Sequence, residues 1–243
     1  MILANVRRTL RRDDAQLVLR LLSRGSDSEL ERAEAALSDR GLDELLDDPR
    51  LLDALIESRQ GTCASYGLFA YVVVRQAMRS VGEEDRVLAD YVASLLLHFG
   101  LGQRATRVAE SDDEVYDTLA ELLAAAEGPD PQRAFLVRAH LGNYALWLSG
   151  VFPEYIASRH WRRGAPDLDY FETMGRRGYE MAAGHRLAAE HGLTALYGAA
   201  AERFPLLRVA LNRVSDRFLF PNVHSPDRLM RHVRDESRWK LMS

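Results

Sequence analysis

The sequence predicts an all-α protein, a multi-helix bundle of nine to eleven helices arranged around a buried central helix. Apolar residues recur at helical spacing along most of the 243 residues. Between these periodic runs lie residues that cap helix starts, and glycines or prolines that end helices. The β-branched run Val72–Val74 is short and lies inside a helical period, so no strand is expected.

The first predicted helix covers the opening of the chain. Ile2, Val6, Leu10, Leu17 and Leu21 approximate one apolar stripe, with arginines on the opposite face. The first fifty residues are richer in charge and poorer in aromatic residues than the rest. We therefore expect a single helical domain over residues 1–243, in which residues 1–48 form a helical arm or hairpin.

Five sequence signals predict where later helices begin. A Ser or Thr three residues before a Glu is typical of a capping box, and an Asp before a Pro supplies the N-cap and the first helical residue. Such signals occur at Ser28 with Glu31, Asp48 with Pro49, Ser111 with Glu114 and Asp130 with Pro131; Asp167 is predicted to cap a helix without either pattern.

The predicted central helix spans residues 63–78, which are apolar almost all round. Cys63 at its start is the only cysteine of the chain. Its neighbours Ala64 and Tyr66 favour burial, so we expect an inert, buried thiol. One cysteine also excludes an intramolecular disulfide and any multi-cysteine metal site.

Charge and hydropathy restrict the partners. The formal net charge of −4 does not favour a nucleic-acid partner. Of the 32 basic residues, 31 are arginine. The apolar windows 68–74 and 91–97 are far shorter than the roughly 20 residues that span a bilayer. We expect a cytoplasmic protein without a membrane partner. An alternative, in which the arginines of residues 7–12 lie on an anionic membrane, is weakened by Asp13 and Asp14.

The stretch 140–179 concentrates the features that binding sites use. It holds Trp147, Trp161 and several tyrosines, whereas the rest of the chain is mostly Leu, Ala, Arg and Glu at helical spacing. Tryptophan, tyrosine and arginine dominate interface energetics, and aromatic rings line many small-molecule pockets. A function that leaves a mark on this sequence is expected here.

Three helical stripes carry polar side chains. Each has two interpretations: side chains that are satisfied within the fold, or side chains that line a pocket. For the stripe that contains Glu172, satisfaction within the fold would be an ion pair of Glu172 with Arg176, one turn apart. For the stripe that contains Asp90, it would mean that Asp90 lies at the solvated start of its helix. The stripes are Asp90, Ser94 and His98; His140, Asn143, Tyr144 and Trp147; and Asp167, Asp169, Glu172 and Arg176.

Small residues accompany the second stripe. Gly142, Ala145 and Ser149 would let another helix or a ligand approach closely. The basic run of residues 159–163, which surrounds Trp161, would suit stacking with phosphate contact. In an acidic chain a solvated loop is the plainer interpretation of this run.

No recognised catalytic, nucleotide-binding or metal-binding motif is present. The chain lacks Glu-x-x-His and His-Glu-x-x-His, a Gly-x-Ser-x-Gly elbow and a phosphate-binding glycine loop. We therefore expect no cofactor and no metal, and assign no catalytic residue. A mononuclear metal site using His98, His140, Glu154 and Asp169 is the remaining alternative.

One resemblance can be stated from the motifs. Residues 142–153, GNYALWLSGVFP, are followed by Asp-Tyr-Phe at 169–171 and then by Gly175 and Tyr179. This order resembles a set of uncharacterised bacterial helical proteins that share a Gly-Asn/Asp…Leu-Phe…Gly-x-Phe segment and a Tyr-Tyr…Gly…Tyr helix.

The resemblance covers roughly residues 58–215 and differs at Trp147 and Phe171, where each exchange keeps an aromatic ring. It implies a shared fold and transfers no activity.

These observations predict a non-enzymatic binding or assembly protein that uses the aromatic segment 147–161 as an interface or pocket. The expected assembly is a homo-oligomer, with a dimer favoured. The alternative is an enzyme or carrier that holds a small molecule or a single metal between helices. The candidate ligand or interface residues are His98, His140, Asn143, Tyr144, Trp147, Glu154, Tyr155, Trp161, Asp169, Tyr170, Glu172 and Tyr179.

Overall fold

The computed structural model describes residues 1–100, 103–108 and 114–242, and it confirms the all-α prediction. Over these residues the chain forms fifteen α-helices, two short 3₁₀ helices and one π-helical turn, with no strand. The number of α-helices exceeds the predicted nine to eleven partly because the expected opening helix is divided in two.

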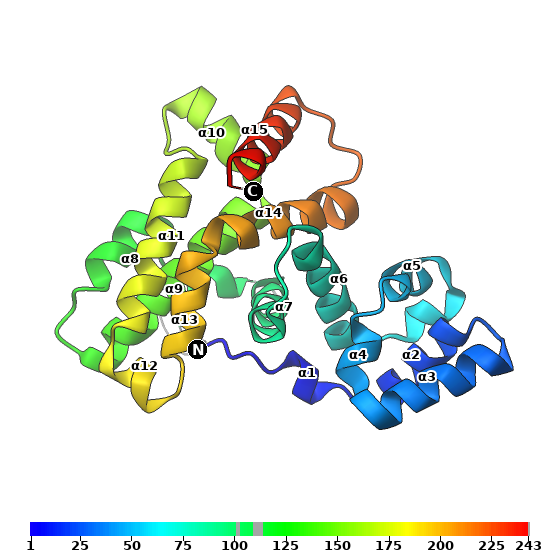
Figure 1. The fold of residues 1–243 in the computed structure, drawn as a ribbon. Helices are drawn as coiled ribbons and strands as arrows, with labels where there is room; N and C mark the ends of the chain where they lie inside the picture. The colour runs from blue at the N-terminus through cyan, green and yellow to red at the C-terminus, as the bar shows by residue number, and fades with distance from the viewer. Residues whose placement is uncertain (101–102, 109–113, 243) are drawn as a thin grey trace. The chain divides into compact units, whose positions relative to one another are not determined.

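The chain forms two compact units. Ile2–Gly100 make the first and Leu101–Ser243 make the second. Figure 1 colours the helices of the N-terminal unit from blue to teal, and those of the C-terminal unit from green to red.

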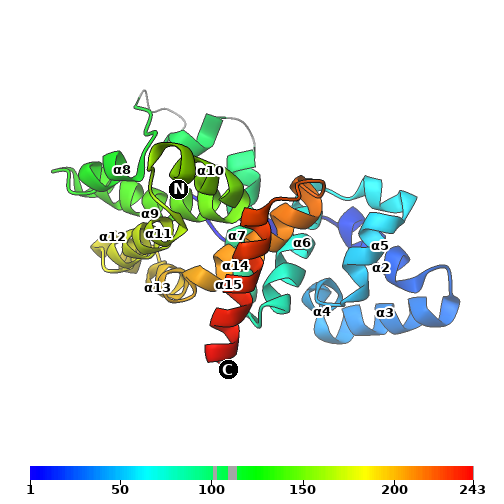
Figure 2. The ribbon, with the colours of Figure 1, turned by 90° about the horizontal axis from the view of Figure 1, so that it is seen from above.

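In the N-terminal unit, α2 packs against α3 and α5, and α6 packs against α7. Figures 1 and 2 show α2 to α5 grouped together in this unit. The elements are α1 (Val6–Thr9), α2 (Arg12–Ser23), α3 (Asp27–Arg40), α4 (Leu42–Leu46), α5 (Arg50–Glu57), the 3₁₀ helix η1 (Arg59–Cys63), α6 (Tyr66–Ser80) and α7 (Arg86–Gly100).

The predicted opening helix is two helices rather than one. Leu10 is extended, with ψ of 133°, and ends α1. The Asp14 carboxylate then accepts the backbone N–H of Arg11 at 3.0 Å, which caps a new helix. A local side-chain cap therefore interrupts an apolar stripe that looked continuous.

The predicted buried central helix over residues 63–78 is not confirmed as a whole. Tyr66 and Phe69 near the start of α6 are 86% and 39% exposed, whereas the six consecutive residues Ala70–Arg75 are all buried. Cys63 is exposed rather than buried, because it ends η1, a surface 3₁₀ helix without buried residues. Neighbouring apolar residues suggested burial, but the helix begins only after this cysteine.

Asp90 is buried, not solvated as expected. Its side chain lies on α7, and its Oδ1 atom accepts the backbone N–H of Arg7 at 2.9 Å. Burial raises the pKa of Asp90, and the bonds and charge of Arg7 oppose that rise. Ser94 on the same stripe donates to the Asp90 carbonyl at 2.8 Å. Asp90 thus links α1 to α7.

A second buried charge in this unit is Arg75, which is 2% exposed. Its Nε and Nη2 atoms donate to the two carboxylate oxygens of Asp47 at 2.7 and 2.9 Å. Burial alone would raise the pKa of Asp47, but hydrogen bonds from Arg75 and Arg86 lower it. This bidentate pair joins α6 to the end of α4.

In the C-terminal unit, α9 packs mainly against α11, α14 and α8. Fifteen of its side chains or glycines are buried, so α9 is enclosed along most of its length. The elements are the 3₁₀ helix η2 (Gln103–Thr106), α8 (Leu119–Ala125), α9 (Pro131–Val151), α10 (Pro153–Arg163), α11 (Leu168–Ala183), α12 (Arg186–Glu190), α13 (Thr194–Glu202), α14 (Phe204–Val214), the π-helical turn η3 (Ser215–Leu219) and α15 (Pro226–Met242).

Two predicted helix starts in this unit are confirmed. Asp130 caps α9 through the N–H of Gln132 at 2.9 Å, and Asp167 caps α11 through the N–H of Tyr170 at 3.0 Å. The helix that Asp167 begins ends at Ala183, and His185 then caps the short helix α12.

Three other predicted starts are wrong or fall elsewhere. Ser26, not Ser28, precedes α3. The helix α5 begins at Arg50, one residue later than predicted, but the Asp48 side chain accepts the N–H of Arg50 at 2.9 Å, as expected of its cap. Ser111 lies outside the described residues, and Glu114 is not helical. The capping box that opens α8 is instead Thr118 with Glu121.

The tightest helix contact is between α9 and α11, which Figures 1 and 2 show side by side. A Cβ atom on Gly178 would lie 2.6 Å from the backbone nitrogen of Gly142, and one on Gly142 would lie 2.6 Å from the ring of Tyr179. A Cβ on Gly175 would be 3.0 Å from that of Ala145. The predicted close approach at Gly142 and Ala145 is therefore to another helix.

We predict that Gly178→Ala lowers the free energy of unfolding by about 1–3 kcal/mol, because the added methyl group meets backbone atoms that cannot move independently. The matched control is Gly198→Ala in α13, where no atom lies within 4 Å of the added Cβ. This control should gain about 0.4–1 kcal/mol, since alanine restricts the unfolded chain and favours helix. Urea unfolding measures both changes, and equal effects would contradict the tight contact.

Candidate functional site

The C-terminal end of α9 is buried, and each of its last four carbonyl groups accepts a hydrogen bond. The last four carbonyls of a helix lack intrahelical donors. The Leu148 carbonyl accepts the N–H of Phe152 at 3.0 Å. The other three carbonyls accept hydrogen bonds from side chains at the end of α14 and just after it. The Asn212 amide donates to the carbonyls of Ser149 and Gly150, both at 2.8 Å, and the Ser215 hydroxyl donates to the Val151 carbonyl at 2.7 Å.

Arg208 orients this amide. Its Nη1 atom donates to Asn212 Oδ1 at 2.7 Å, so the amide nitrogen faces the α9 carbonyls. The guanidinium is 2% exposed and is also bonded by Glu172 of α11 and Asp235 of α15. Glu172 therefore pairs with Arg208, and the expected ion pair with Arg176 is wrong. Arg208, Asn212 and Asp235 are structural residues that the sequence interpretation missed.

Because α9 ends at Val151, the chain turns at Phe152 and α10 begins at once with Pro153, which has no N–H to satisfy. A cavity of about 730 Å³ lies beside this turn, and we call it the aromatic pocket. Most of its lining is aromatic or aliphatic. It is lined by Asp117, Thr118, Leu119, Ala120, Tyr144, Leu148, Phe152, Tyr155, Ile156, Arg159, Ala165, Pro166, Tyr170 and Phe171.

The most enclosed lining residues of the aromatic pocket are Leu119, Tyr144 and Ile156, which are 3%, 7% and 2% exposed. Burial raises the pKa of Tyr144, and the negative charge of Asp117 adds to that rise, whereas Arg159 opposes it. The His140 ring stacks on the Tyr144 ring at 6.1 Å. No residue in the described part of the chain forms a hydrogen bond with the Tyr144 hydroxyl.

Two exposed charged side chains, Arg159 and Asp117, also line the pocket. Arg159 Nη1 donates to the Tyr155 hydroxyl at 3.0 Å, and the guanidinium lies 5.5 Å from the centre of that ring. The backbone N–H of Asp117 is bound by Glu121 at 2.9 Å, so the capping box of α8 positions this residue.

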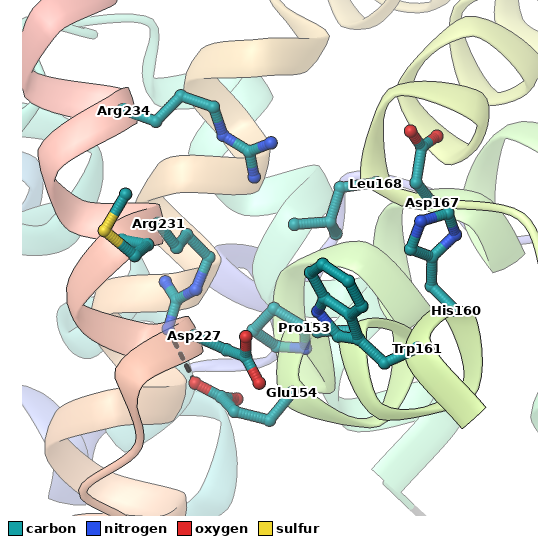
Figure 3. Close-up of a pocket in the computed structure, with 11 residues that line it drawn as sticks. Pro153, Glu154, His160, Trp161, Asp167, Leu168, Asp227, Arg231 and Arg234 are labelled. Atoms are coloured by element: carbon teal, nitrogen blue, oxygen red, sulfur yellow. Dashed lines mark hydrogen bonds and ion pairs between the residues drawn. The ribbon is translucent and has the colours of Figure 1, made fainter.

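A second hollow lies on another side of α10, between that helix and α15, and we call it the α10–α15 groove. Its volume is about 330 Å³. Trp161 is 77% exposed there, and Met230 on α15 is 64% exposed. The groove is lined by Pro153, Glu154, Ala157, His160, Trp161, Asp167, Leu168, Asp227, Met230, Arg231 and Arg234, drawn in Figure 3.

A network of charges fixes α15 beside this groove. Figure 3 shows Arg231 extending from α15 to Glu154 of α10, and its Nη2 atom donates to Glu154 Oε1 at 2.9 Å. Arg228 also donates to Glu154 at 3.1 Å. Asp216 of η3 accepts from Arg231 at 3.0 Å and from His232 at 2.7 Å. Glu154 thus anchors a helix and is not free to bind a ligand.

The structure separates the other candidates of the α9 stripe from the pocket. His140 donates from Nε2 to the Ala105 carbonyl at 3.0 Å. Asn143 accepts the hydroxyl proton of Tyr179 at 2.9 Å, in a fully buried bond. Trp147 is 9% exposed and packs edge-on against Phe152 at 5.5 Å. These four predicted residues belong to the core.

The remaining candidates lie apart. His98 is half-buried on α7 of the N-terminal unit, and Asp169 is exposed on α11. Residues 159–163 are helical rather than a loop, since they end α10. Of the twelve candidates, Tyr144, Tyr155 and Tyr170 meet at the aromatic pocket, and Glu154 and Trp161 meet at the groove.

Within the described residues, no three His, Cys, Asp or Glu side chains are grouped so that they could hold a metal ion. None of the described helices has both the length and the apolar character needed to cross a bilayer.

Comparison with known proteins adds no relative. The chain matches no protein-family model, and neither a curated protein nor a solved structure is significantly similar to it. The resemblance to the bacterial helical proteins stays a prediction.

We predict that Glu154→Gln lowers the free energy of unfolding at pH 7 by about 1–3 kcal/mol, because two arginines lose a charged acceptor. Burial alone would raise the pKa of Glu154, but Arg231 and Arg228 lower it. A lowered folded-state pKa stabilises the fold above the unfolded-state pKa, and this contribution is lost as the pH falls through the folded-state value.

The difference between wild type and Glu154→Gln should therefore shrink below about pH 4. Urea unfolding at pH 7, 5 and 3.5 measures it. Glu190→Gln is the control, since its pair with Arg186 is exposed and should change stability by less than about 0.5 kcal/mol. A difference that is constant with pH would contradict the role given to the Glu154 charge.

Proposed function

We propose that the C-terminal unit is a binding module that holds a small organic molecule with an aromatic ring in the aromatic pocket. The observation that carries this proposal is Tyr144, whose ring is mostly buried at an aromatic cavity while its accessible hydroxyl has no partner among the described residues. This hydroxyl is not among the fully buried polar atoms, so it is accessible from the cavity and available for a hydrogen bond with a ligand.

Size and lining support the same proposal. Small-molecule sites occupy about 300–1,000 Å³ and combine apolar walls with a few polar groups. The pocket has about 730 Å³, with Phe152, Tyr170 and Phe171 as half-buried rings. Ring stacking against these side chains would hold an aromatic ligand, and the Tyr144 hydroxyl would orient it.

Two tyrosine-to-phenylalanine variants test this proposal. We expect p-cresol and indole to bind the wild-type chain with dissociation constants on the order of 1 mM, as small aromatic fragments do. Tyr144→Phe should weaken p-cresol binding about threefold to tenfold, because one hydrogen bond is lost. Stability should not fall, since that hydroxyl has no partner within the described residues.

The matched control is Tyr179→Phe, which removes a hydroxyl that is bonded to Asn143 in the core. It should lower the free energy of unfolding by about 1 kcal/mol and leave p-cresol binding unchanged. Isothermal titration calorimetry and saturation-transfer NMR measure binding. A wild-type chain that binds neither probe would refute the proposal.

The exposure of Trp161 favours a second candidate function, in which the α10–α15 groove contacts a second copy of the chain. Trp161 and Met230 both line this groove, at 77% and 64% exposure. Exposed apolar groups that gather in one place are typical of contact surfaces, and tryptophan is a frequent interface anchor.

We predict that Trp161→Ser converts the expected dimer to a monomer, with the shift visible by light scattering over a concentration series. Tyr66→Ser is the matched control, because Tyr66 is an 86% exposed ring on α6 of the other unit. It should leave the oligomeric state unchanged. A wild-type chain that is monomeric at every concentration would exclude this second function.

A further inference from the structure

The aromatic pocket has two charged lining residues of opposite sign, carried by different elements. Arg159 belongs to α10, and Asp117 directly precedes the capping residue of α8. Among the described residues neither forms an ion pair, so no carboxylate lies within 4.0 Å of the Arg159 guanidinium and no basic group lies that close to Asp117. The two charges line one cavity without neutralising each other.

This pairing behaviour differs from that of the structural arginines. Arg208, Arg228 and Arg231 each contact two carboxylates. Arg159 has only the neutral phenol of Tyr155, which holds the guanidinium over its ring and leaves most of its five donors available. A planar guanidinium held in this way is suited to binding a carboxylate through two parallel hydrogen bonds.

The carboxylate of Asp117 is likewise available to bind a charged group. Its backbone N–H is bound by Glu121, so the capping box fixes the residue while its carboxylate makes no ion pair with the described residues. A free carboxylate at the rim of an aromatic cavity suits an ammonium group, which the π-faces of neighbouring rings also attract. Arg159 alone would favour an anion, and Asp117 would oppose it.

We infer that the ligand of the aromatic pocket is amphoteric, a free amino acid with an aromatic side chain, whose carboxylate contacts Arg159 and whose ammonium group contacts Asp117. This inference rests on the proposed function, because it names the class of molecule that the same pocket binds. The aromatic side chain would lie against Phe152, Tyr170 and Phe171. A ligand with one charge would gain from one of the two charged residues and be repelled by the other.

Four probes of similar size test the inference on the full chain: phenylalanine, 3-phenylpropanoate, 2-phenylethylamine and 2-phenylethanol. These carry both charges, the carboxylate alone, the ammonium alone, and no charge. We expect phenylalanine to bind about 9-fold to 25-fold more tightly than 2-phenylethanol, measured by calorimetry at low ionic strength. Exposed charged contacts are each expected to change affinity by about threefold to fivefold.

Charge-removing variants assign the contacts. Arg159→Gln should weaken phenylalanine and 3-phenylpropanoate about threefold to fivefold and should not weaken 2-phenylethylamine. Asp117→Asn should weaken phenylalanine and 2-phenylethylamine and spare 3-phenylpropanoate. Arg162→Gln is the control, since Arg162 is exposed on the same helix and does not line the pocket. It should change none of the four affinities.

The outcomes separate this inference from the proposed function. Equal affinities for the four probes, or variants without effect, would overturn the amphoteric ligand and leave an aromatic pocket that binds by its rings alone. Preference for one singly charged probe over phenylalanine would also overturn it. Binding of none of the four, together with none of p-cresol and indole, would refute the pocket itself.

Discussion

The C-terminal unit depends on the way in which α9 ends inside the protein. A helix that stops in the core leaves carbonyl groups that water cannot reach, and each unpaired one costs about 1–3 kcal/mol. Here Asn212 and Ser215 bond to the last three of them. The amide can do so only while Arg208 holds its oxygen, and Arg208 can be buried only because Glu172 and Asp235 balance its charge. Four helices are thereby connected through one guanidinium.

The aromatic pocket is a consequence of that ending. Since α9 ends at Val151, the chain turns at Phe152 and α10 begins in a new direction. The cavity lies beside this turn. On the other side, α9 and α11 touch at Gly142 and Gly178, where no side chain separates them. The same two helices supply Tyr144, Leu148, Tyr170 and Phe171 to the pocket, so the contact that closes the core also places its walls.

Much of the fold follows from local sequence, whereas the site follows from it only in part. Asp130 and Asp167 could be predicted as caps because an N-cap depends on one local side chain that bonds a backbone N–H at the start of the helix. Tyr144 could not be distinguished from His140, Asn143 and Trp147 by spacing, because α9 is surrounded on nearly all sides. A helix enclosed in this way has no polar face, so periodicity carries no information about which side chain reaches a cavity.

Arginine illustrates the same limit of composition. With 31 arginines among 32 basic residues, the residue type alone cannot mark a site. The structure distinguishes them by what balances the charge: Arg208 and Arg75 are buried and bound by carboxylates, which fold energetics require of a buried cation. Arg159 is held by a phenol that cannot balance it, in a cavity where Asp117 is also unpaired within the described chain. Charges that the fold does not need for its own stability are the ones available to bind a ligand.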